Sequence, residues 1–192
     1  MLAVLRGLSL IVLVAFTGPS VAGESVRFGW FPAVSNIDVR EPSGSAEIYT
    51  GLTYLSGVLF VDLGRDSRLF VHGHYDTFDL AASTTNIHQS VDQYGVSVAY
   101  QINLRIARAW KPWVGVGLGY SQDKITDRYI LTPGGFSGAR YPDRTEDSVS
   151  AIANFSSEWQ LSREWDMGLH FQWEEPVGDG VRAVRVGFYF VY

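Results

Sequence analysis

Cysteine is absent from the 192-residue sequence, and its absence excludes disulfide bonds, thiol catalysis and thiolate metal sites. Charged residues are also scarce, at 18% of the chain where soluble proteins usually carry about 25%. The net charge of −5 provides no basic surface, so we expect no nucleic-acid partner. The sequence has instead 14% aromatic residues and 20 glycines, which favours strands, turns and membrane interfaces over a helical bundle.

Long hydrophobic runs are missing after the first two dozen residues. The chain begins with a short segment that carries Arg6, continues with an apolar run over residues 7–16, and then has small residues up to Ala22. This order is typical of a signal peptide, and at about ten residues the run is too short to span a bilayer as a helix. We predict a cleaved signal peptide over residues 1–22 and an exported mature domain over residues 23–192, with an uncleaved anchor as the alternative.

The mature region alternates apolar and polar residues with a period of two, the pattern of β-strands. The last segment is the clearest, because Val186, Phe188 and Phe190 share one face while Arg185 and Gly187 share the other. Eight such segments occur, at approximately residues 26–30, 47–63, 68–76, 93–104, 114–121, 148–161, 165–174 and 183–192.

The second segment, residues 47–63, alternates less cleanly because apolar residues occur on both of its faces. Leu55, Leu59 and Val61 interrupt the polar pattern of one face. The apolar face is expected to hold Ile48, Leu52, Tyr54, Val58 and Phe60.

The connections between these segments alternate in length. Short connections at residues 64–67, 105–111 and 162–164 follow the even-numbered strands, whereas long ones at 33–46, 80–90 and 128–145 follow odd-numbered strands. Such alternation around an even number of antiparallel strands is typical of bacterial outer-membrane barrels, and a sheet in lipid must close because its edges carry unpaired backbone groups. We therefore predict an all-β fold, an eight-stranded antiparallel up-and-down transmembrane β-barrel.

The composition of the two faces indicates which one meets lipid. The polar face consists of Gly, Ser, Ala, Asn and Gln with few charges, unlike the Lys- and Glu-rich outer face of a soluble lipocalin-like barrel. Aromatic residues lie near the ends of the apolar strand faces, where an interfacial girdle is expected. They are Trp30, Tyr94, Tyr120, Trp159, Trp165, Trp173 and Tyr192.

Two stretches carry a resemblance to a known family. These are the terminal residues 185–192, RVGFYFVY, and the glycine-rich residues 111–121, KPWVGVGLGYS. Together with the signal peptide, they resemble the small eight-stranded outer-membrane barrels of the OmpA, OmpX/Ail and OmpW type, without resolving a subfamily. The resemblance implies a Gram-negative outer membrane, contact with its lipid and lipopolysaccharide, and insertion by the barrel-assembly machinery.

With lipid outside, the polar face lies in the lumen of the barrel. Its ionisable residues are Arg27, Arg68, His72, His74, Asp76, Asp123, Glu158, Asp166, His170, Glu174 and Arg185. Buried charges must be paired or hydrated, and eight strands enclose only enough space for side chains. We expect a polar network that largely plugs the lumen of a structural or surface-interacting protein, with a narrow channel for small solutes as the alternative.

No catalytic, cofactor or metal site is expected. His72, His74 and Asp76 succeed one another at steps of about 6–7 Å, too far apart to hold one metal without ligands from other strands. A lipid A-modifying enzyme is a further alternative, since lipid A deacylases use a His and a Ser two residues apart on a strand. Here Gln172 stands two residues after His170, and none of the expected strands contains a His-x-Ser pair.

The connection at residues 128–145 is the best candidate for contact with the surroundings of the cell. Its aromatic and cationic residues are Tyr129, Phe136, Tyr141, Arg128, Arg140 and Arg144. Arginine side chains bind phosphates well, so this loop is expected to contact lipopolysaccharide or a host or phage surface. The alternative is a mobile loop of variable sequence.

Overall fold

The computed structural model describes residues 25–40, 46–53, 55–80, 87–106, 112–178 and 180–192. The predicted signal peptide, residues 1–22, lies outside these ranges. Within them, no helix is long and apolar enough to cross a membrane. The strands are β1 (Val26–Trp30), β2 (Ala33–Arg40), β3 (Ala46–Thr53), β4 (Leu55–Asp62), β5 (Ser67–Leu80), β6 (His88–Asn103), β7 (Trp113–Leu131), β8 (Ser137–Arg140), β9 (Arg144–Gln160), β10 (Asp166–Pro176) and β11 (Arg182–Val191).

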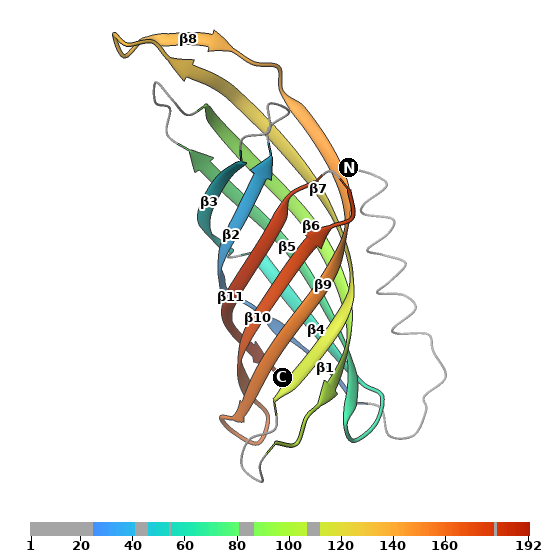
Figure 1. Ribbon diagram of the computed structural model, residues 1–192. Coiled ribbons are helices and arrows are strands. Elements are labelled where there is room, and N and C mark those ends of the chain that lie inside the picture. Colours follow the sequence, from blue (N-terminus) through green and yellow to red (C-terminus); the bar gives the residue numbers. More distant parts are fainter. Residues whose placement is uncertain (1–24, 41–45, 54, 81–86, 107–111, 179) are drawn as a thin grey trace.

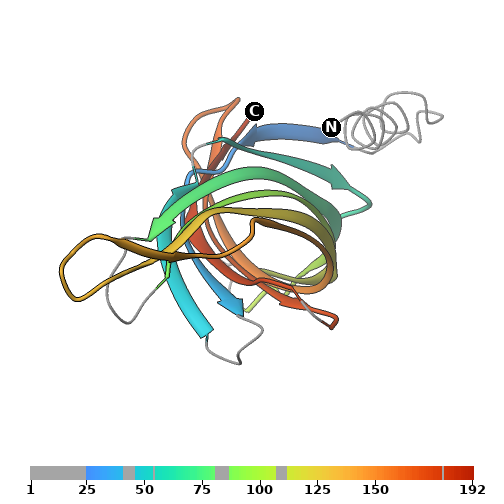
Figure 2. The same ribbon diagram turned by 90° about the horizontal axis from the view of Figure 1, so that it is seen from above.

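The strands form one antiparallel sheet that closes into a ring, seen from above in Figure 2. Strand β11 pairs with β10 on one side and with both β1 and β2 on the other. In the ring, β1 and β2 act as one interrupted strand, β3 and β4 as a second, and β8 is an extension that pairs with β7. The predicted eight-stranded antiparallel barrel is therefore confirmed.

The first long connection was expected over residues 33–46, and this prediction is wrong for most of its length. Residues 33–40 form β2, which pairs with β11 and β3. Pro32 has no N–H, but the ladder continues around it: the Phe31 N–H donates to the Ser56 carbonyl (3.3 Å) and the Phe188 N–H to the Pro32 carbonyl (3.2 Å). The proline therefore interrupts the strand locally instead of ending it.

The other two long connections are also shorter than predicted. Strand β5 continues to Leu80 and β6 begins at His88. Of the expected loop at residues 80–90, most of the residues that the structure describes therefore belong to the barrel wall. The expected 128–145 loop is a hairpin in which β7 reaches Leu131 and β8 folds back on it through the turn 132–136. This hairpin rises above the rest of the barrel at the top of Figure 1.

The apolar side of the wall changes from outside to inside along the same strands. In the lower part of β7, Val116 points outward and is 70% exposed, whereas further up Ile125 is fully buried and Lys124 faces outward. Strand β5 repeats this change, since Phe78 is buried between exposed Thr77 and Asp79. The inward apolar residues of the upper part form one cluster: Ile37, Val39, Tyr49, Phe78, Val91, Ile125, Val181 and Ala183.

The faces predicted for residues 55–61 are reversed in the structure. Val58 and Phe60 are buried in the barrel, and Leu55 faces outward with 68% exposure. The alternation slips by one residue between buried Thr53 and exposed Leu55, so Ile48 and Leu52 face outward as predicted while Val58 and Phe60 do not. Tyr54 itself lies outside the described residues. Because both faces of β4 are apolar, the sequence pattern could not reveal the slip.

Candidate functional site

The lower interior is organised around Arg68 of β5, which is fully buried. Its guanidinium donates hydrogen bonds to Glu158 (2.5 Å), Gln101 (2.6 Å) and Ser156 (3.2 Å). The rings of Phe60 and Trp113 each lie 4.1 Å from the guanidinium carbon, measured to the ring centroid. Each guanidinium nitrogen thus has an acceptor, and the aromatic rings supply cation–π contacts that an exposed arginine would lack.

A second arginine lies at the lower end of this layer. Arg27 of β1 approaches Asp166 (2.9 Å), Asp62 (3.6 Å) and Glu158 (3.7 Å), and its side chain remains 22% exposed. Glu158 therefore joins Arg27 to Arg68. Asp62 was not among the predicted interior residues, because the second expected strand showed no clear polar face.

The upper charged layer is organised around Arg185 of β11. Its guanidinium donates to Asp76 (3.0 Å), to Nε2 of His74 (2.7 Å), and to Glu174 and Gln93, and all of these side chains are buried. Because Nε2 of His74 accepts this hydrogen bond, the imidazole is neutral with its proton on Nδ1. One cation thus lies between two carboxylates.

Asp123 extends the upper layer from β7. It accepts a hydrogen bond of 2.7 Å from Gln93, which in turn accepts from Arg185. The sequence analysis did not identify the neutral members of the network. Glutamine and serine are common on a polar strand face, so their presence does not indicate which of them form hydrogen bonds with the buried charges.

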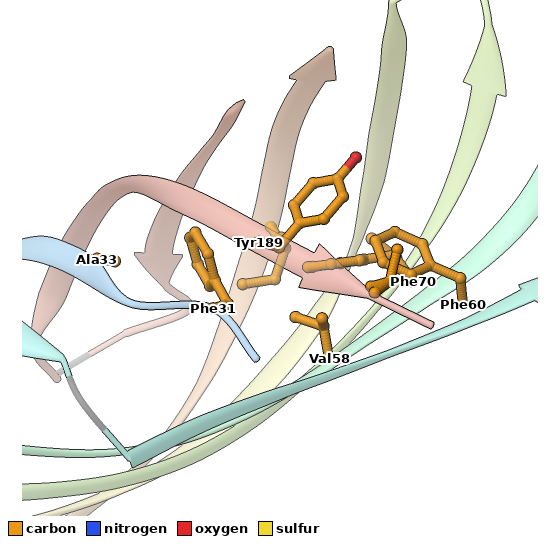
Figure 3. Close-up of a cluster of buried hydrophobic side chains, with 9 residues drawn as sticks. Phe31, Ala33, Val58, Phe60, Phe70 and Tyr189 are labelled. Carbon is orange, nitrogen blue, oxygen red and sulfur yellow. The ribbon is translucent and has the colours of Figure 1, made fainter. Parts of the chain in front are cut away.

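Aromatic side chains separate the two charged layers. The ring of His170 lies 5.0 Å from Phe31 and 4.5 Å from Phe70, and the ring of His72 lies 5.2 Å from Phe31. Figure 3 shows Phe31, Phe60, Phe70 and Tyr189 projecting into the interior from the wall. Gln172 links this layer to the upper one, since it donates to Glu174 (2.7 Å) and to Nδ1 of His72 (3.3 Å).

Arg128, expected in a surface loop, is buried near the top of the barrel. It donates to Gln89 (3.0 Å) and to the Pro142 carbonyl (3.0 Å), and so ties β6 to both ends of the β7–β8 hairpin. Arg144 pairs with Glu146. Of the cationic side chains predicted to face outward from this segment, Arg140 is exposed on β8.

The outer rim beside β10 and β11 carries a separate ion pair. Arg182 donates two hydrogen bonds of 2.7 Å to Glu175 and lies 3.8 Å from Asp38. The hydrogen bonds to Glu175, with the negative charges of both carboxylates, raise the pKa of Arg182 above its ordinary value. This pair joins the wall strands β2, β10 and β11 at their upper ends.

His72, His74 and Glu174 bring their ligand atoms within 4.8 Å of one another, as a metal site requires. Each of the three residues already has a hydrogen-bond partner at a potential ligand atom. Arg185 binds both His74 and Glu174, while the two nitrogens of His72 meet Ser56 (2.9 Å) and Gln172. The guanidinium of Arg185 takes the position of a cation in this cluster, so the donor set does not fit an additional metal ion.

The structure adds one His-x-Ser pair to a strand, contrary to our expectation from the sequence. Because β6 begins at His88, the strand includes both His88 and Ser90. The Ser90 hydroxyl donates to Asp79, while the His88 ring packs against Tyr129 at 4.6 Å. Within the described part of the chain no hydrogen bond joins His88 to Ser90, so the pair does not form the nucleophile and base that acyl transfer needs.

Comparison with known proteins supports the fold and gives no closer identity. No family model and no curated protein matches the chain. Neisserial surface protein A superposes with a TM-score of 0.56 at 11% identity, over 88% of this chain and 97% of that one. OprG from Pseudomonas aeruginosa superposes with a TM-score of 0.52 at 13% identity, over 89% of this chain and 96% of that one. The chain has the fold of the small outer-membrane β-barrels.

Removing Arg185 tests the upper charged layer. Arg185→Met should lower the free energy of unfolding by about 3–5 kcal/mol, because Asp76 and Glu174 would stay buried without a cation. Adding Asp76→Asn and Glu174→Gln should recover at least half of that loss. Urea titration of the folded protein in detergent micelles measures both values. A loss below about 1 kcal/mol in the single variant would show that the layer is hydrated and not held by Arg185.

Proposed function

We propose that this protein is integral to the outer membrane of a Gram-negative bacterium, exported with its signal peptide and inserted by the barrel-assembly machinery. A belt of exposed apolar side chains supports this location, since soluble monomers rarely expose contiguous apolar patches larger than a few hundred Å². Members of the belt are Val98, Val116, Leu118, Val149, Leu169, Phe171, Val186 and Phe188.

Aromatic residues border the belt at both heights. Tyr94, Tyr120 and Trp173 lie at its upper edge, and Trp165 and Tyr192 lie at its lower edge. The eight residue steps from Trp165, which immediately precedes β10, to Trp173 within it span about 27 Å along the strand, or about 19 Å along the membrane normal at a tilt near 45°. That height approaches the ~25 Å apolar band of outer-membrane barrels.

We further propose that the lumen is closed and that the protein acts through its outer surface. The observation that carries this is the complete burial of Arg68 and Arg185, each hydrogen bonded to side chains from other strands across the bore. An aromatic layer separates the two charged layers, and the apolar cluster around Ile37, Phe78 and Ile125 lies above both. A continuous water path would have to pass both apolar layers.

Planar-bilayer recording tests the closed lumen. The inserted protein should give no steady single-channel steps at neutral pH and moderate salt, because side chains occupy the space that eight strands enclose. Insertion is verified in the same preparation by the shift in gel mobility between boiled and unboiled samples. Reproducible steps whose ion selectivity changes in Asp76→Asn would instead establish the narrow channel.

The change of sidedness along β7 predicts where the bilayer lies. Val116→Arg should cost about 2–4 kcal/mol of folding free energy in vesicles, because it places a charge near the middle of the apolar belt. The control, Thr126→Arg, is on the same strand and the same outward face but above Tyr120, and it should change stability by less than about 0.5 kcal/mol. Equal effects of the two substitutions would refute this position of the membrane.

The β7–β8 hairpin is the surface that we propose for contact with lipopolysaccharide. Its turn carries Phe136, which is 77% exposed, and Arg140 and Tyr141 are exposed beside it. Arg128 and its hydrogen bonds hold the base of the hairpin, so the exposed cation and aromatic rings are presented from a fixed support. A guanidinium suits phosphate oxygens, and the rings suit the interface between polar and apolar groups.

Substitutions in the hairpin test this contact. Phe136→Ser with Arg140→Ser should reduce the lipopolysaccharide that co-purifies with the protein several-fold, with no change in the boiled-to-unboiled shift. Arg163→Ser removes an exposed cation from the turn between β9 and β10, at the opposite end of the barrel, and serves as the matched control. If the double variant retains as much lipopolysaccharide as the control, the hairpin is not the contact surface.

A further inference from the structure

An apolar groove of about 550 Å³ crosses the outer face of β1, β4, β5, β6 and β7. Its floor is formed by Gly57 and Gly73, which are partners across β4 and β5. Leu59 and Val71 form the wall below them, and Tyr75 stands above. The rings of Tyr75 and Tyr94 stack at 4.8 Å along that upper edge. The groove is therefore a hollow in a belt whose other positions carry mostly large side chains.

Packing does not explain the two glycines of the floor. A Cβ at residue 57 would lie 3.9 Å from the Gly29 carbonyl oxygen, and one at residue 73 would lie 4.0 Å from the Gly95 carbonyl oxygen, both ordinary contacts. Gly117, in contrast, faces inward, where a Cβ would overlap the Val98 carbonyl. The fold thus admits side chains at residues 57 and 73, and their absence leaves the groove open.

The groove is inclined to the membrane by the tilt of the strands. Cross-strand partners lead along it from Trp30 through Gly57, Gly73 and Val96 to Tyr120. This row crosses four strand spacings, about 19 Å, and at a strand tilt near 45° it descends about 14 Å. One leaflet of a ~30 Å hydrocarbon core has a similar depth, so the groove matches one acyl chain that enters at the upper aromatic edge.

The rim above the groove is charged and already hydrogen bonded. The Tyr75 hydroxyl donates to Asp92 (3.2 Å), and both the Tyr120 hydroxyl and Gln122 donate to Asp147 (3.0 and 2.9 Å). Lys124 is the cross-strand partner of Asp92 and is exposed. Carboxylates beside a lysine complement a headgroup that carries both an ammonium and a phosphate.

We propose that this groove binds one acyl chain of a zwitterionic glycerophospholipid that has entered the lipopolysaccharide-bearing outer leaflet, with its ammonium group at Asp92 and Asp147. The proposal depends on the proposed function, because acyl chains surround this face only in a barrel inserted in a membrane. The glycines at residues 57 and 73 provide the space for the chain, and the stacked rings of Tyr75 and Tyr94 bound it at the interface.

Photo-crosslinking from the bilayer tests the site. The full-length mature chain is folded into vesicles that contain phosphatidylethanolamine with a diazirine on one acyl chain, irradiated, and mapped by mass spectrometry. Cross-links should concentrate in segments 57–59, 71–75 and 94–96 relative to the equally apolar segments 149–153 and 169–173. The same label on phosphatidylglycerol, which lacks the ammonium, should give several-fold fewer cross-links at these segments.

Filling the groove supplies the matched variants. Gly73→Leu and Gly57→Leu should reduce the cross-links at the three segments at least three-fold, and Gly73→Ala should reduce them less. Ala153→Leu enlarges a small outward residue of the belt outside the groove and should leave the pattern unchanged. The boiled-to-unboiled shift shows in each case that the variant is folded.

Each remaining outcome overturns the proposal. A folded, inserted protein that is labelled uniformly around the belt has no lipid site here, although the proposed function stands. Exclusion of the lipid label from the three segments, together with a dimer band in the unboiled gel that Gly73→Leu abolishes, identifies an interface between copies of the chain instead. A protein that does not insert into vesicles contradicts both the lipid site and the membrane location.

Discussion

Pairing of β11 with the first two strands closes the ring, and the other features of the molecule depend on that closure. A closed ring leaves no row of unpaired backbone groups, which is the condition for a sheet in hydrocarbon. With eight strands, closure also fixes a bore that side chains can fill. Side chains therefore pack in the interior, and the charges buried there need partners.

The solution in this protein is to alternate layers of different character. Arg68 is held between aromatic rings and acceptors, and Arg185 between carboxylates and neutral polar groups. Breaking such a buried pair is more costly than replacing it whole, so each layer behaves as a unit. Apolar side chains lie between and above these layers, and a low local dielectric constant strengthens hydrogen bonds.

The sequence was sufficient to predict the number of strands and the faces of β10 and β11, because the lower half of the barrel alternates strictly. It failed where the environment changes along a strand. Ile37 and Ile125 are apolar residues that face inward above the belt, so the same alternation carries the opposite meaning there. The slip between Thr53 and Leu55 left no trace in a segment that is apolar on both faces.

Partners of the interior charges were only partly predictable for a related reason. Charged residues on a polar strand face are visible in the sequence, whereas the pairing between Arg185 and Gln93 depends on which strands face each other across the bore. Arg128 shows the same limit. The composition of residues 128–145 suggested a surface contact, whereas in the fold Arg128 is hydrogen bonded at the base of the hairpin and supports it.

The change of sidedness along the strands has a consequence for the depth of the protein in a bilayer. If the barrel moved deeper into the membrane by two residues, Lys124 and Asp92 would approach the hydrocarbon. The free-energy cost of a basic side chain in hydrocarbon is about 2–4 kcal/mol near the midplane and decreases toward the interface. Sliding outward would expose Leu118 and Phe171 to water. Deforming the bilayer costs only fractions of a kcal/mol per Å. The sequence therefore determines the depth of the barrel in the bilayer, and a membrane of a different thickness must become thicker or thinner around it.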